Sequence, residues 1–235
     1  MSILLLVPVV GGALGGLYFV VPFWVKKLLA SRLSRRVAAS GVACLTFDDG
    51  PDPRSTPQLL DLLDRAGVKA TFFALGCQVS AHPELARRIV ESGHELGEHG
   101  FGHRHAWKTD PARYLADLVR GRRAVARCLP AGGHALFRPA YGEINLLTLL
   151  YIGLGRRRMI MWNLNPRDFE ATSAEEVAQR IGRELRVGSV VLLHDARHGV
   201  EADPKLTVEA VRLVLAEADR RGLRLAAVGA ALSGP

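Results

Sequence analysis

The sequence of 235 residues has few cysteines, no glycine-rich phosphate loop beside a strand and no internal repeat. Its three cysteines, Cys44, Cys77 and Cys128, are far apart in apolar surroundings, which favours reduced core thiols over a disulfide framework. The GGALGG run lies inside an apolar segment, so nothing indicates a nucleotide cofactor. The length suits one domain of about 200 residues with a short appendage.

Charged side chains are absent from residues 1–25, which form a long apolar run. A helix of that length can cross a hydrocarbon core of about 30 Å, so we expect residues 1–25 to be a transmembrane anchor. A cleaved signal peptide would carry its positive charges before the apolar core, whereas here they follow it. A buried or interfacial helix is the alternative. Gly11 and Gly15 would share one helix face, which offers a small-residue surface for a homodimer.

Basic residues cluster directly after that run, in a segment at 26–40 that we expect to lie beside the membrane. Five of the 31 lysines and arginines are found there, namely Lys26, Lys27, Arg32, Arg35 and Arg36. The other 26 nearly balance the 23 acidic residues, so the net charge of +8 does not indicate a nucleic-acid partner. The charge bias predicts a single-pass protein of the cell membrane with its folded domain in the cytoplasm, and the extracytoplasmic orientation stays open.

From residue 41 onward, apolar runs of strand type alternate with segments of helical periodicity. Strands are expected at 42–47, 69–75, 94–99, 158–165, 188–195 and 223–228, and within ALFRPAYG at 135–142. Helices are expected at 57–67, 83–93, 111–128, 173–185 and 204–221. This alternation predicts an α/β fold with a parallel sheet and helical crossovers. With about seven strands and no second domain, we expect residues 41–235 to form a closed or nearly closed barrel.

Ionisable side chains follow five of the expected strands, where active sites of such barrels lie. They are Asp48 and Asp49, His99 and His103, Arg138, Asp168, and His194. A carboxylate with two imidazoles spaced His-x-x-x-His supplies three metal ligands and leaves one coordination position open, as in catalytic zinc sites. The remaining groups would supply acid and base, so the set indicates a metal-dependent hydrolase.

Five segments, in this order, resemble the motifs of the polysaccharide deacetylase family, also called the NodB homology domain or carbohydrate esterase family 4. They are TFDDGP at 46–51, HGFGH at 99–103, RPAYG at 138–142, WNLNPRDF at 162–169 and LLH at 192–194. The resemblance covers about residues 42–230 and implies a distorted (β/α) barrel. It also implies that Asp49, His99 and His103 bind a divalent metal ion, with zinc expected.

The same resemblance implies a role for each of the other motif residues. Asp48 would be the general base and His194 the general acid. Arg138 would orient Asp48, and Asp168 would fix the tautomer and basicity of His194. The backbone N–H of Tyr141 would help to hold the oxyanion of the tetrahedral intermediate.

Three positions depart from the family pattern without removing a catalytic group. Gly100 replaces a Ser or Thr, Ala140 replaces a second Pro, and Phe169 stands where Trp is frequent. Because the hydroxyl lost at position 100 can pin the metal-binding loop, we expect a looser metal site. The other two changes reshape the pocket wall, so the usual polymer specificity of the family does not transfer directly.

The expected function is that of a metal-dependent hydrolase that removes an acetyl or formyl group from the nitrogen of an amino sugar. With the domain in the cytoplasm, the partner would be a lipid-linked saccharide at the membrane face. With the opposite orientation, the substrate would be peptidoglycan or an exopolysaccharide. A third possibility is a catalytically silent carbohydrate-binding protein, which the complete set of motif residues argues against.

Overall fold

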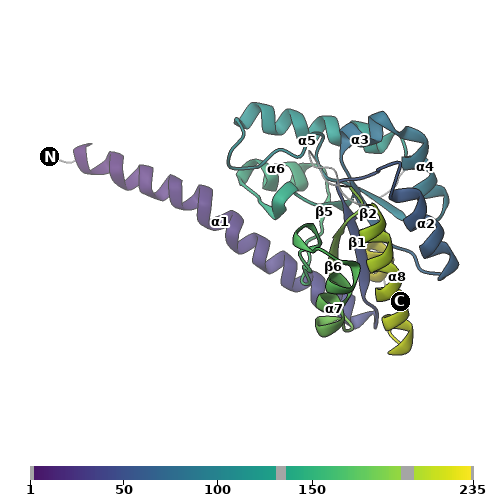
Figure 1. Cartoon of the computed structure of the whole chain (residues 1–235). Helices are drawn as coiled ribbons and strands as arrows, with labels where there is room; N and C mark the ends of the chain where they lie inside the picture. The colour runs from purple at the N-terminus through teal and green to yellow at the C-terminus, as the bar shows by residue number, and fades with distance from the viewer. Residues whose placement is uncertain (1–2, 131–135, 197–203, 234–235) are drawn as a thin grey trace.

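The computed structural model describes residues 3–130, 136–196 and 204–233, and the side chains of residues 3–17, 19 and 204 lie outside that description. The chain begins with one continuous helix, α1 (Ile3–Ala39), which runs through both the expected anchor and the basic segment. Its first turns project away from the domain (Figure 1), whereas Leu33 and Val37 near its C-terminal end are buried in the core.

The transmembrane anchor expected at 1–25 is not supported. Within the described part of the chain, no helix has both the length and the apolar character required to span a bilayer. The homodimer face expected at Gly11 and Gly15 falls among the side chains outside the description.

The domain is built on a sheet of six parallel strands in the order β5-β4-β3-β2-β1-β6. The strands are β1 (Cys44–Asp48), β2 (Thr71–Ala74), β3 (Glu95–Glu98), β4 (Leu136–Phe137), β5 (Arg158–Met159) and β6 (Val190–His194). The expected parallel α/β fold is therefore confirmed. The described residues contain six strands instead of about seven, and the sheet forms part of a barrel whose edges are β5 and β6.

Two expected strands are largely missing because the chain leaves the ladder after a few residues. Of the strand expected at 158–165, only β5 pairs with β4. The chain then reaches β6 at a single bridge, from Leu164 to Val191. The strand expected at 223–228 makes one bridge, from Leu225 to Ala43, and then turns into helix α9 (Val228–Ser233). The barrel is thus only nearly closed.

Helices cover the sheet on its outer side (Figure 1). They are α2 (Thr56–Arg65), α3 (Gly76–Ala81), α4 (Pro83–Glu91), α5 (Pro111–Ala126), α6 (Leu146–Leu154), α7 (Ala174–Glu184) and α8 (Pro204–Arg220). Local sequence explains several helix starts, because Asp110 accepts hydrogen bonds from two backbone N–H groups of α5 and Ser173 accepts one from α7. The sequence did not predict α3 or α6.

Candidate active site

The candidate site lies at the carboxyl end of the parallel strands. Asp48, the last residue of β1, is in register with His194, the last residue of β6. Glu98 ends β3 and is in register with Phe137 of β4, so the residues that follow these strands emerge at the same edge. Parallel pairing thereby brings together motifs that are far apart in the sequence.

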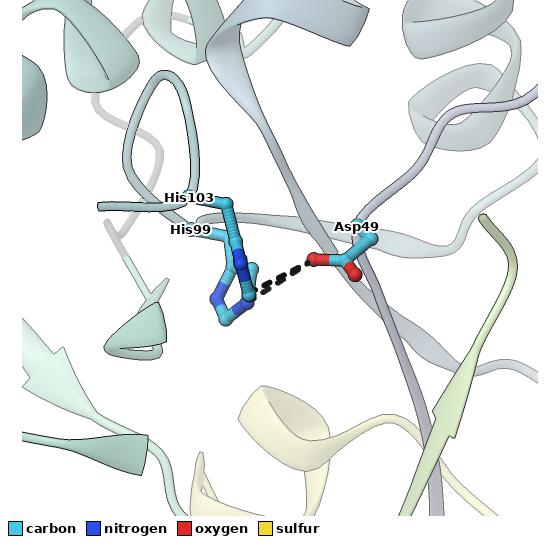
Figure 2. Close-up of side chains that lie close together, drawn as sticks. All are labelled: Asp49, His99 and His103. Carbon is cyan, nitrogen blue, oxygen red and sulfur yellow. Dashed lines mark ion pairs between the residues drawn. The ribbon is translucent and has the colours of Figure 1, made fainter. Parts of the chain in front are cut away.

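Asp49, His99 and His103 form a cluster whose ligand atoms lie within 4.8 Å of one another. Figure 2 shows both imidazole rings directed toward the Asp49 carboxylate. Asp49 Oδ1 is 3.5 Å from His99 Nε2 and 3.4 Å from His103 Nε2. Asp49 and His103 both have positive φ, 76° and 53°, a conformation that aims these side chains inward from tight turns.

The spacing of these three atoms fits a divalent metal ion. Two ligands that each lie about 2.1 Å from a tetrahedral ion are separated by about 3.4 Å. The two Asp49–imidazole separations, 3.5 and 3.4 Å, match this value. One carboxylate and two imidazoles also form a donor set suited to zinc and similar ions, with at least one position left for water or substrate.

Arg138 orients one of these histidines through its backbone. His99 Nδ1 lies 2.8 Å from the carbonyl oxygen of Arg138. Because a carbonyl only accepts, Nδ1 must carry the proton, which leaves the lone pair of Nε2 facing Asp49. The neutral tautomer that a metal requires is therefore set before any ion binds.

The Arg138 side chain is fully buried and is held by four acceptors. Its Nη1 donates to Asp48 Oδ1 at 2.7 Å and to Thr46 Oγ1 at 2.8 Å. Burial lowers the pKa of Arg138 and the Asp48 carboxylate opposes that shift. The pair fixes one oxygen of Asp48, while the other, Oδ2, lies 3.7 Å from His99 Nε2 beside the Asp49–His99–His103 cluster.

His194 and Asp168 form a second charged pair beside the pocket, next to Asp48 across the β1–β6 pairing. Asp168 accepts from the His194 backbone N–H at 2.9 Å, and its other oxygen lies 2.8 Å from His194 Nδ1. Burial acts to lower the pKa of His194, but Asp168, with smaller contributions from Asp48 and Asp49, raises it to about 9. The imidazole is therefore protonated at neutral pH, and Nε2 lies on the ring side away from Asp168.

Tyr141 lies at the rim of the pocket, in the short helix η1 (Ala140–Gly142). Its φ of 57° is unusual for a residue with a side chain, and its ring contacts the His103 ring at 4.3 Å, centroid to centroid, with the planes tilted by 53°. No backbone hydrogen bond from the Tyr141 N–H is found among the described residues. The N–H expected to hold an oxyanion is thus available to substrate.

The charged groups surround a pocket of about 420 Å³ that also has apolar walls. Trp162, Phe169 and Leu192 supply those walls, and Phe169 meets the His194 ring edge-on with centroids 6.0 Å apart. Gly142 packs so closely that an added Cβ would lie 2.5 Å from the Trp162 ring. The pocket therefore has room for a small acyl group beside a sugar.

One residue missed in the sequence, Asp117 of α5, holds the loop that carries His99 and His103. Its carboxylate accepts from the backbone N–H groups of Phe101 and Gly102, at 2.9 and 2.8 Å. Gly100 has φ of +80° and packs directly on Gly121, where a Cβ would lie 2.3 Å from the Gly100 backbone. The loop that lost a hydroxyl at position 100 is thus pinned by a carboxylate instead.

A second missed residue, Asp195, supports the loop that carries Asp49. Asp195 Oδ1 accepts from Gly50 N at 3.0 Å, and Oδ2 accepts from Thr56 Oγ1 at 2.6 Å. Burial raises the pKa of Asp195 to about 7, although the hydrogen bond from Thr56 acts to lower it. Its place directly after His194 was the only signal in the sequence.

Comparisons with known proteins agree with this geometry. The sequence profile of a family described as polysaccharide deacetylase matches residues 36–153. A peptidoglycan-N-acetylglucosamine deacetylase of Bacillus cereus is 31% identical over 189 residues, or 80% of this chain and 86% of the relative. A chitooligosaccharide deacetylase of Bradyrhizobium sp. is 32% identical, over 77% of this chain and 86% of the relative. The solved structure of peptidoglycan deacetylase PdaC from Bacillus subtilis matches with a TM-score of 0.72 at 26% identity, over 82% of this chain and 90% of that one.

Proposed function

Because this chain belongs to the polysaccharide deacetylase family, we propose that it removes the N-acetyl group from N-acetylglucosamine units of a glycan. It is a hydrolase of the carbohydrate N-deacetylase class. One observation carries the finer proposal. Asp48, paired with Arg138, and His194, paired with Asp168, both line the pocket that Asp49 also lines.

We assign the metal site to Asp49, His99 and His103, and the ion to zinc. When bound there, a divalent ion supplies Lewis acidity at the amide carbonyl and lowers the pKa of coordinated water toward about 7. The protein's own contribution is to present one carboxylate oxygen and two imidazole lone pairs at ligand spacing.

Asp48 acts in the proposal as general base. The hydrogen bond from Arg138 orients its carboxylate, so that Oδ1 is held and Oδ2 lies 3.7 Å from Nε2 of the proposed ligand His99. The same guanidinium is fully buried, so the position of the carboxylate is fixed from inside the domain.

His194 acts as general acid toward the departing amine. An amine leaves poorly as an anion, so a proton must reach its nitrogen as the C–N bond breaks. The Asp168 contact keeps His194 protonated at neutral pH and directs Nε2 away from Asp168. The Tyr141 N–H at the rim would donate to the oxyanion that forms on the carbonyl oxygen.

The substrate proposal follows the relatives, which are named for peptidoglycan N-acetylglucosamine and for chitooligosaccharides. The apolar walls at Trp162, Phe169 and Leu192 suit the methyl of an acetyl group, and the pocket volume of about 420 Å³ suits one sugar. We therefore prefer a glycan polymer to the lipid-linked saccharide as the first substrate to test.

The place of action is a separate proposal. The uneven charge around the N-terminal apolar run favours the cell membrane, with the catalytic domain in the cytoplasm. A polymer of the cell wall as substrate would instead require the extracytoplasmic orientation. A topology reporter fused after Pro235 distinguishes the two orientations.

Release of acetate tests the proposed reaction directly. Purified full-length protein would be incubated with peptidoglycan, chitooligosaccharides and a lipid-linked N-acylated sugar, each with and without a chelator. We expect acetate from at least one polymeric substrate, loss of release with the chelator, and recovery on adding zinc. Chelator-resistant release would contradict the metal assignment, and release from the lipid-linked sugar alone would contradict the substrate assignment.

A further inference from the structure

A second pocket, separate from the one that Asp48 and His194 line, lies between α1 and the edge of the sheet. It encloses about 380 Å³ and is lined by residues of α1, α6, β5 and α9. Four arginines contribute to it. Arg32 and Arg36 belong to α1, Arg158 begins β5, and Arg157 directly precedes β5. No acidic residue lines this pocket.

Only one of these arginines has a carboxylate partner in the described structure. Arg157 Nε donates to Glu98 Oε2 at 2.9 Å, so its charge is balanced inside the domain. Arg32, Arg36 and Arg158 are exposed, and no described residue forms an ion pair with any of them. Arg32 and Arg36 also stand four residues apart on one helix, where like charges repel. The site therefore suits an anion that would relieve this repulsion.

The remaining surface of the pocket is apolar. Leu29 and Leu33 of α1 and Ile152 of α6 line it with Met159, Ile160 and Leu232. A small hydrated anion gains nothing from such walls, whereas an anion attached to a hydrocarbon chain buries that chain against them. The arginines and the apolar walls together match a phosphate with an attached acyl chain.

The protein surface beside the pocket is apolar as well. Leu150 and Leu154 of α6 lie one helical turn apart and expose 51% and 87% of their surface, and Leu154 follows a residue that lines the pocket. Leu28 of α1, next to the lining residue Leu29, is 46% exposed. Exposed apolar side chains around a basic site are the features of a surface that rests on an anionic bilayer.

We propose that the pocket between α1, α6 and β5 binds the phosphate and upper acyl chain of an anionic phospholipid, which docks this face of the protein on a membrane surface. Arg32, Arg36 and Arg158 contact the phosphate. None of these three arginines lines the catalytic pocket, so their replacement tests the lipid site without changing a residue of the proposed deacetylase chemistry.

Binding of the full chain to vesicles tests the proposal. Vesicles of phosphatidylcholine alone would be compared with vesicles that also contain phosphatidylglycerol, using wild type and the triple variant Arg32→Gln, Arg36→Gln, Arg158→Gln. The matched control removes three exposed arginines without ion pairs among the described residues, Arg65→Gln, Arg123→Gln and Arg183→Gln. Both triple variants have the same net charge.

We expect wild type to prefer the anionic vesicles and the pocket variant to lose roughly fivefold in affinity for each arginine removed, well beyond the loss in the control. A photoactivatable phosphatidylglycerol should label peptides covering residues 29–36 or 152–160. Equal binding to both vesicles, equal loss in the two triple variants, or displacement by inorganic phosphate alone would overturn the proposal. Acetate release from a soluble oligosaccharide, measured in parallel, should stay at the wild-type rate in both variants.

Discussion

Histidines at the two ends of the same sheet differ in charge state, because His194 has a raised pKa and His94 a lowered one. At the carboxyl end, Asp48 is paired with Arg138 and His194 with Asp168, so charged groups persist inside a pocket. At the amino end, His94 precedes β3 and is buried in an environment that lowers its pKa to about 4, chiefly by burial and then by Lys69. Its Nε2 is 3.6 Å from Asp64 Oδ1, beyond a good hydrogen bond.

We interpret this difference as one of role: Asp48 and His194 serve the proposed chemistry, whereas His94 serves the folded structure. The proposed base and acid are held charged beside the pocket, whereas at the amino end His94 is held by a neutral contact, the hydrogen bond from Ala70 N to its Nδ1. Substitutions at the carboxyl end should therefore alter turnover and metal binding, whereas those at the amino end should alter stability.

The largest effects should come from the two neighbouring aspartates after β1. Asp49→Ala removes a proposed ligand, so we expect metal to be lost on gel filtration and activity to become undetectable. Asp48→Asn keeps the three ligands, so we expect metal to remain while activity falls by about 10²–10⁴-fold. Metal content and acetate release measure both outcomes. Unchanged metal content in Asp49→Ala would refute the ligand assignment.

Asp168→Asn should have the next largest effect and should change the pH profile. Protonated His194 is the active form, so activity falls as pH rises through its pKa of about 9. Without the Asp168 charge, burial dominates and this pKa drops, which moves the alkaline limb of kcat/KM to lower pH. We expect about 100-fold lower activity at neutral pH. An alkaline limb that stays in place would show that another group titrates.

Asp117→Ala should weaken metal binding by about 10–100-fold, because two backbone N–H groups of the HGFGH loop lose their acceptor. Titration of the metal-free protein with zinc measures the affinity. Asp219→Ala, which removes an exposed carboxylate from α8, is the matched control and should leave the affinity unchanged. Equal affinities in the two variants would mean that the loop is held without Asp117.

The sequence predicted the elements whose pattern is local. Helices at 57–67, 83–93, 111–128 and 173–185 are confirmed as α2, α4, α5 and α7 within a few residues at each end. The uniformly apolar α6 has no helical periodicity to detect, so it was missed. The strand expected at 223–228 is reduced to one bridge at Leu225, because the chain turns into α9 at Val228, where the distant Glu95 accepts from the N–H groups of Gly229 and Ala230.

Within the site, the sequence indicated the residues that follow strands but not those that support them. Asp48, Asp49 and His194 come directly after or at the end of apolar runs, and parallel pairing places such positions together. Asp117 belongs to a helix and contacts a loop 15 residues away, so no local motif contained it. Its position three residues after the buried Tyr114, on the inward face of α5, was the available signal.

The smallest predicted effect lies at the amino end and concerns stability alone. His94 is neutral when folded because its pKa is about 4, but it would take up a proton in the unfolded chain near 6.5. Between these values the unfolded state binds more protons, so stability falls as pH decreases, by about 1 kcal/mol for each pH unit. His94→Gln removes this contribution, and urea unfolding across that window should show a flatter dependence. Activity at neutral pH should not change, and a loss of turnover would show that the two ends of the sheet are coupled.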